Sequence, residues 1–131
     1  MKYFFDNCFS KKLTKFLAEL GIEKNQTIKH LQDMFSQNVQ DEEWIRDLSK
    51  DGNWVVLTSD LRIAKNRTTK TVLQDSGLTT FFFPKKFSQL DIFEQSWRTI
   101  KKWPEIVKYS EKRPKGSWFE LNGNFKIIDK N

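Results

Sequence analysis

The chain has 131 residues, a length that suits one domain with a single core. Its 23 Lys and Arg against 17 Asp and Glu give a net charge of +6, and 12 Phe with 5 Trp are more aromatic mass than a disordered chain carries. No apolar run approaches the roughly 18 residues that a membrane span requires. A secretory signal needs a long apolar stretch near the N-terminus, and here Asp6 follows Phe4-Phe5 directly. The single Cys8 excludes an internal disulfide and a zinc site built on several cysteines. We therefore expect a soluble, cytoplasmic protein with one domain over residues 1–131.

Charge is distributed unevenly along the chain. Residues 1–60 carry a net charge of −2, whereas residues 61–131 carry +8. A basic half of this kind can follow a phosphate backbone, but it can equally serve solubility alone. Charge by itself leaves both interpretations open.

The first third of the sequence predicts a strand, a turn and a helix. Lys2–Phe5 is a short aromatic run closed by a polar turn, which is typical of a buried strand. Ser10 is a candidate N-cap for an amphipathic helix that Gly21 would end. The next segment, residues 22–38, allows two interpretations: a short helix, or a second strand ending at Ile28.

The middle of the chain alternates helices and strands. Asp41 is a candidate N-cap for a helix ending at Gly52, and residues 54–58 form the clearest strand, apolar on both faces. A helix over residues 68–76 and a strand over residues 78–83 are expected to follow. This alternation predicts an α/β fold, a doubly wound sheet of mostly parallel strands.

The last third is more helical. Residues 88–102 have the spacing of an amphipathic helix, and Pro104 is expected to open a second helix that reaches Glu111. Two strands, residues 118–121 and 125–128, flank Asn122-Gly123, a dipeptide typical of tight hairpin turns. We therefore expect a C-terminal β-hairpin.

Carboxylates follow or open elements at one predicted edge of the sheet. Asp6 follows the first strand, Asp60 follows the central strand, and the run Asp41-Glu42-Glu43 opens a helix at the same edge. Ligands of parallel sheets bind beyond the carboxyl ends of the strands, and a divalent cation relieves the repulsion between clustered carboxylates. The pattern predicts a Mg²⁺ or Mn²⁺ site, although each acid alone could be only a helix cap or turn former.

Oxygen ligands of this kind most often serve phosphodiester chemistry, because the cation polarises a phosphate and acidifies a water. The sequence has no Gly-rich phosphate loop, and its only histidine, His30, has no second histidine for a histidine-dependent nuclease. We expect His30 to lie at the surface or to cap a helix.

Several short runs together resemble the PIN-like nucleases, in particular the VapC-type toxin branch with a Trp after its central acids. The resemblance covers residues 2–128 and implies a three-layer α/β/α PIN-like fold, a Mg²⁺- or Mn²⁺-dependent ribonuclease and a cognate antitoxin. The runs that carry it are Phe5-Asp6-Asn7 with Leu13, Asp41-Glu42-Glu43-Trp44-Ile45, residues 54–60 with Arg62 and Ile63, and Gly77-Leu78.

The resemblance implies that Asp6, Asp41 and Asp60 are the catalytic, metal-binding acids, with Glu42 or Glu43 as a fourth. The sequence departs from the family pattern where related proteins often have another acid, because here Leu61 and Arg62 follow Asp60. This departure leaves open an inactive member that only binds RNA or a protein.

Basic residues cluster after Asp60. Arg62, Lys65 and Arg67 are candidates for holding RNA phosphates, or they are simply the solvated entrance of a helix. The pairs Lys85-Lys86 and Lys101-Lys102 are expected to be ordinary surface lysines.

We therefore expect a metal-dependent endoribonuclease acting as the toxin of a toxin–antitoxin pair. Its partners would be RNA and an antitoxin, with no membrane, and a homodimer is an assembly to test. The alternative is a catalytically weak or inactive PIN-like module that binds RNA or a protein. A phosphatase-like enzyme is disfavoured because Asp6 after the first strand is followed by Asn7 and Cys8, so the Asp-x-Asp motif of such enzymes is absent.

Overall fold

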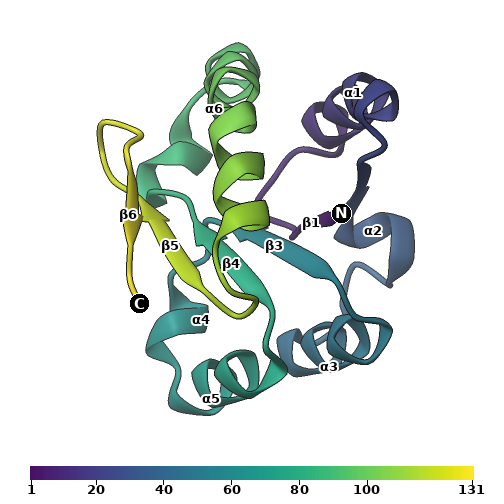
Figure 1. The fold of residues 1–131 in the computed structure, drawn as a ribbon, viewed down its shortest axis with the longest axis vertical. Helices are drawn as coiled ribbons and strands as arrows, with labels where there is room; N and C mark the ends of the chain where they lie inside the picture. The colour runs from purple at the N-terminus through teal and green to yellow at the C-terminus, as the bar shows by residue number, and fades with distance from the viewer.

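The computed structural model describes all 131 residues and confirms the mixed α/β fold (Figure 1). Its centre is a six-stranded sheet in the order β2-β1-β3-β4-β5-β6. Neighbouring strands are parallel except for β6, which runs antiparallel to β5 as the predicted C-terminal hairpin. The strands are β1 (Lys2–Phe5), β2 (Thr27–His30), β3 (Trp54–Thr58), β4 (Thr79–Phe82), β5 (Trp118–Leu121) and β6 (Ile127–Asp129).

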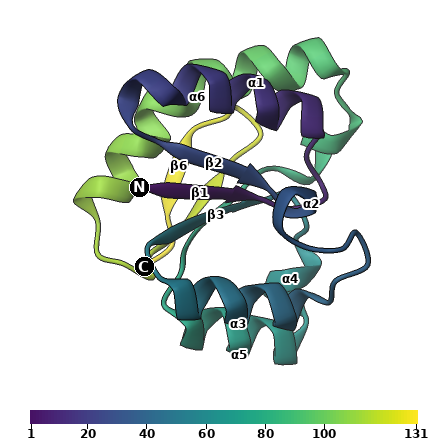
Figure 2. The same cartoon turned by 90° about the vertical axis from the view of Figure 1, so that its right-hand side faces the viewer.

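Helices cover both faces of this sheet, as Figure 2 shows. Helices α1 and α6 lie on one face, and α3, α4 and α5 lie on the other, so the predicted three-layer α/β/α arrangement is confirmed. The α-helices are α1 (Lys11–Gly21), α2 (Leu31–Met34), α3 (Asp41–Asp51), α4 (Arg62–Lys65), α5 (Arg67–Ser76) and α6 (Ile92–Lys112). Two short 3₁₀ turns, η1 (Ile22–Lys24) and η2 (Lys85–Gln89), join them. None of the helices combines the length and hydrophobicity that a membrane span requires.

The central strand β3 explains why the core forms on both sides of the sheet. All five of its residues are buried. Val55 and Leu57 pack into the core beneath α1 and α6, whereas Trp54 and Val56 pack into the core beneath α3 and α5. A strand covered on both faces has no polar side, which is why its first four residues, 54–57, are all apolar.

Three predicted helix boundaries, at Ser10, Gly52 and Gly77, are confirmed by specific caps, whereas the helix predicted over residues 88–102 begins only at Ile92. The Ser10 hydroxyl accepts a hydrogen bond from the backbone N–H of Lys12 at 3.1 Å and so caps α1. Gly77 ends α5 with φ +69°, a left-handed conformation that glycine adopts without steric cost. Gly21, in contrast, remains helical, and the chain turns only at Asn25 with φ 56°.

Residues 22–38 contain the 3₁₀ turn η1, the strand β2 and the single helical turn α2. Of the two interpretations of this segment, the strand is confirmed, but it continues past Ile28 to His30, which pairs with Phe5 in parallel register. The helix is limited to the single turn α2. The buried His30 ring accepts from the N–H of Gln32 at 3.1 Å, so His30 caps α2 but does not lie at the surface. Its other ring nitrogen lies 2.8 Å from the carbonyl oxygen of Phe9.

Three further predictions of local structure are wrong. Asp41 is the first residue of α3 and not its N-cap, which is Gln40. Pro104 lies inside the continuous helix α6, because the buried Trp103 and Ile106 hold the turns on both sides of it. The hairpin turn is longer than Asn122-Gly123, because Phe125 adopts φ 60° and buries its ring beside Phe83.

Candidate functional site

The candidate site lies where the strand order of the sheet reverses. From β1 the chain passes through α1 to β2 on one side, and then crosses to β3 on the other side of β1. Asp6 directly follows β1, and Asp60 lies two residues beyond β3. Ligands of doubly wound sheets bind at such a switch point, beyond the carboxyl ends of the strands. Topology therefore places these two acids at the edge where a ligand is expected.

Asp6 is a buried carboxylate with both oxygens engaged. It is 5% exposed, and it accepts hydrogen bonds from the Thr58 hydroxyl and, at 2.9 Å, from the backbone N–H of Cys8. Burial raises the pKa of Asp6 to about 6, although the two hydrogen bonds oppose this shift; the nearby charge of Asp60 adds to it. At neutral pH the Asp6 carboxylate therefore carries a desolvated negative charge, and its hydrogen-bond partners are Thr58 and Cys8, both uncharged.

Asp60 is connected to Asp6 through Thr58. The Thr58 hydroxyl, which donates to Asp6, accepts from the backbone N–H of Asp60 at 2.9 Å. The carboxylate of Asp60 accepts two bonds from the guanidinium of Arg62, at 2.9 Å from Nε and 3.0 Å from Nη2. These bonds to Arg62 lower the pKa of Asp60 despite its partial burial.

Asp41 is the third acid, placed by the first turn of α3. Its Oδ1 accepts a hydrogen bond from the indole N–H of Trp44 at 3.0 Å, and this bond holds the carboxylate in place. Burial raises the pKa of Asp41, and the charges of Asp60 and Glu42 raise it further. Asp41 therefore lies within the electrostatic reach of Asp60.

The two glutamates beside Asp41 differ in their surroundings. Glu42 is half-buried and accepts a hydrogen bond from the Thr69 hydroxyl at 3.1 Å, which connects α3 to α5. Glu43 is exposed. Of the two residues, Glu42 is the one that the protein holds in place.

The arrangement is not assembled as a metal centre. No group of three or more His, Cys, Asp or Glu side chains is positioned to hold a metal ion. The donor set nevertheless fits Mg²⁺ or Mn²⁺ in kind, since its members are carboxylates, and two of them have raised pKa values. Arg62, whose side chain is 90% exposed, occupies the oxygens that Asp60 would contribute.

The basic residues predicted for RNA separate into two places. Arg62 and Lys65 line a hollow of about 350 Å³ beside Asp60, together with Lys85 from η2. Arg67 is exposed at the start of α5 and does not line the hollow. Sequence reasoning overlooked Thr58, although it ends the clearest strand, and it treated Lys85 as an ordinary surface lysine, whereas Lys85 lines the hollow.

Cys8 borders the same hollow without acting as a nucleophile. Burial, together with the charge of Asp6, raises the pKa of the Cys8 thiol to about 12. The thiol therefore remains protonated at neutral pH, and a protonated thiol is a poor nucleophile.

Fold and site together define a doubly wound α/β protein with carboxylates at its switch point. Comparison with protein families agrees with this class: residues 1–85 match the family described as PIN like domain. The chain belongs to the PIN-like domain family, whose members are generally nucleases. The match contains β1 to β4 and all the candidate acids, and α6, β5 and β6 extend the same sheet. No curated protein and no solved structure matches the chain.

Proposed function

We propose that the protein is a metal-dependent endoribonuclease with Asp6, Asp41 and Asp60 as its metal-binding catalytic acids. The single observation that carries the proposal is the desolvated carboxylate of Asp6 at the switch point, electrostatically coupled to Asp60. Repulsion and desolvation of this kind are relieved by a bound cation. Membership of the PIN-like family supports nuclease chemistry.

Each residue has a separate role in the proposed site. A bound Mg²⁺ or Mn²⁺ would neutralise the phosphate and acidify the attacking water. Asp6 and Asp60 would hold the ion from the ends of β1 and β3, and Asp41 would close the site from α3. The Thr58 hydroxyl keeps the first two carboxylates in register, because it bonds to Asp6 and to the backbone of Asp60. Glu42 would orient a water, with the exposed Glu43 as a weaker candidate.

Cleavage of a single-stranded RNA tests the proposal. We expect cleavage with Mn²⁺ or Mg²⁺, none with EDTA, and loss of cleavage in Asp6→Asn and Asp60→Asn. Asp75→Asn, which removes an exposed carboxylate of α5, is the matched control and should cleave normally. Cleavage that persists in EDTA, or in both site variants, would contradict the metal-dependent mechanism.

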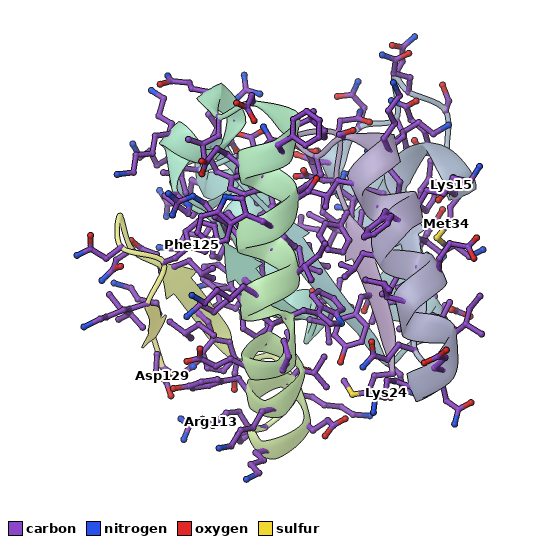
Figure 3. All side chains as sticks on the ribbon, turned by 90° about the horizontal axis from the view of Figure 1, so that it is seen from above. Lys15, Lys24, Met34, Arg113, Phe125 and Asp129 are labelled. Carbon is purple, nitrogen blue, oxygen red and sulfur yellow. The ribbon has the colours of Figure 1, made fainter.

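We further propose that the activity is that of a VapC-type toxin held by an antitoxin. An apolar groove of about 320 Å³ between α1 and α6 supports a protein partner. Figure 3 shows these two helices side by side, with Lys24, one of the residues that line the groove, labelled. Phe16 and Leu20 on α1 and Phe93 and Trp97 on α6 remain 46–81% exposed on the same layer.

One observation favours the second candidate function, a PIN-like module that binds RNA without cleaving it. The guanidinium of Arg62 already neutralises Asp60, so this site satisfies one of its carboxylates without a metal. Calorimetric titration with Mn²⁺ separates the two functions. Absence of Mn²⁺ binding, combined with RNA binding that EDTA leaves unchanged, would support the module and contradict the nuclease.

A further inference from the structure

The hollow beside Asp60 brings together residues from three separate segments at the carboxyl edge of the sheet. Cys8 comes from the turn after β1, residues 59–62 and Lys65 come from the segment after β3, and Lys85 and Ser88 come from η2 after β4. Its volume of about 350 Å³ leaves room for a phosphate group with its water. The hollow is therefore a product of the fold and not of one sequence motif.

Charge in this hollow is unbalanced. Its lining has three cations, Arg62, Lys65 and Lys85, but only one carboxylate, Asp60. The carboxylate is fully engaged by Arg62, so the two lysines are the uncompensated charges. Neither lysine forms an ion pair or donates a side-chain hydrogen bond anywhere in the protein.

Other lysines of the basic half are differently placed. Lys102 pairs with Glu105 at 2.9 Å, and Lys130 lies 3.8 Å from Glu120. Lys101 lies over the ring of Trp97. Lys86 follows Lys85 directly but does not line the hollow; its Nζ approaches Gly123 in the hairpin loop. Lys85 and Lys86 are adjacent in the sequence, but only Lys85 lines the hollow beside Asp60.

We propose that Lys65 and Lys85 form a binding subsite for a backbone phosphate of the RNA adjacent to the one at Asp6 and Asp60. This inference rests on the proposed function, because it assigns the substrate's path through the same site. Lysine binds phosphate as a point charge, and the Ser59 and Ser88 side chains in the wall add polar contacts. The subsite makes Lys85 a substrate-positioning residue, whereas Arg67 lies outside it.

Salt-dependent binding of a short fluorescein-labelled single-stranded RNA tests the subsite, with EDTA present so that no cleavage occurs. The Lys65→Ala, Lys85→Ala double variant is compared with the Arg67→Ala, Lys86→Ala double variant, which loses the same charge from neighbouring positions outside the hollow. Each phosphate contact on a single strand contributes roughly 0.7 to the log–log salt slope. We expect the slope to fall by about 1.4 in the first double variant and to stay near the wild-type value in the second.

Three outcomes separate this proposal from the proposed function. Equal losses in both double variants, or a loss confined to the control, would overturn the subsite while leaving the nuclease intact. RNA binding that depends on Lys65 and Lys85, without cleavage on addition of Mn²⁺, would support the subsite and contradict the nuclease. Absence of RNA binding by the wild-type protein at low salt would overturn the subsite. Thermal melting of each double variant checks that the fold is unchanged.

Discussion

The guanidinium of Arg62 binds both carboxylate oxygens of Asp60, with Nε 2.9 Å from Oδ1 and Nη2 3.0 Å from Oδ2. The backbone N–H of Arg62 also donates to Oδ1 at 3.0 Å. Arg62 therefore makes three hydrogen bonds to the carboxylate of a residue only two positions before it. Arginine fits a carboxylate in this forked geometry, and lysine does not. Arg62 therefore stands where the proposed site would hold a metal cation.

Replacing Arg62 by Ala should tighten Mn²⁺ binding. The substitution frees both oxygens of Asp60 and removes a positive charge from the site, so the pKa of Asp60 should rise towards its ordinary value. Calorimetric titration should give a Kd a few-fold lower than that of the wild type, since exposed ion pairs are individually weak. Arg67→Ala removes the same charge outside the hollow and should leave the Kd unchanged. Weaker Mn²⁺ binding in Arg62→Ala would mean that Arg62 supports the metal site.

Asp6→Asn should change how stability depends on pH. Because the pKa of Asp6 is raised from 3.8 to about 6 by burial, the folded protein binds more protons than the unfolded chain between these values. The free energy of unfolding of the wild type should therefore fall as pH rises from about 4 to 6, by at most about 3 kcal/mol from this group.

Urea denaturation across that range, for the wild type and Asp6→Asn, measures this contribution as a difference. The raised pKa of Asp41 acts in the same direction and the lowered pKa of Asp60 in the opposite one, so only the difference isolates Asp6. Parallel curves for the two proteins would show that the Asp6 carboxylate does not titrate within that range.

Trp44→Phe should disturb the candidate site, because the buried Trp44 holds Asp41 by a hydrogen bond. Trp44 is fully buried, with its ring centroid 4.9 Å from that of Phe4, and it donates to Asp41. Loss of this donor should raise the pKa of Asp41 further and cost about 1–3 kcal/mol of stability through the unmade bond and lost volume. Carboxyl NMR titration and urea denaturation measure the two effects.

Trp54→Phe is a matched control for this prediction. Trp54 also donates to an aspartate three residues before it, Asp51, at 2.7 Å, but Asp51 is exposed and lies at the other end of α3. RNA cleavage should fall in Trp44→Phe and remain at the wild-type level in Trp54→Phe. Similar losses of cleavage in both would indicate a general loss of stability and not a role in holding Asp41.

The buried strands β1 and β3 were predictable because both carry apolar runs. Only a sheet that is covered on both faces tolerates such runs. Residues 22–38 were not predictable, because Ile28 has both helical and strand spacing, and pairing with Tyr3 decides between them. The prediction that Pro104 opens a new helix was wrong for a related reason. A proline inside a helix destabilises that helix locally, but the burial of Trp103 outweighs this loss of stability.

For the candidate site, the sequence allowed us to predict only which types of residue lie at the carboxyl edge of the sheet. Asp6 and Asp60 could be placed there because parallel strands end at the same edge. That Arg62 would bind Asp60 could not be inferred, because a basic residue near an acid can face either the acid or a substrate. Lys85 is more than twenty residues from Asp60 in sequence, and only the fold brings its segment to the hollow.

Expression of the chain without an antitoxin should arrest bacterial growth if the toxin assignment is correct. Asp6→Asn should restore growth, because it removes a proposed metal ligand without opening a cavity in the core. Growth after induction, with immunoblots to verify equal protein levels, measures the effect. Arrest by Asp6→Asn at the same protein level would assign toxicity to something other than RNA cleavage at this site.

Addition of Mn²⁺ should stabilise the protein in a pH-dependent way. A ligand that binds only the folded state adds about 2.7 kcal/mol when its concentration is 100 times its Kd, so the melting temperature should rise with Mn²⁺. Protons compete with the ion for Asp6, whose pKa is about 6, and the shift in melting temperature should therefore be large at pH 7.5 and small at pH 5. Thermal melts at both pH values, with Ca²⁺ and EDTA as comparisons, measure this competition. Asp6→Asn should abolish the shift at either pH. A Mn²⁺ shift that is equal at both pH values, or that persists in Asp6→Asn, would place the ion elsewhere on the protein.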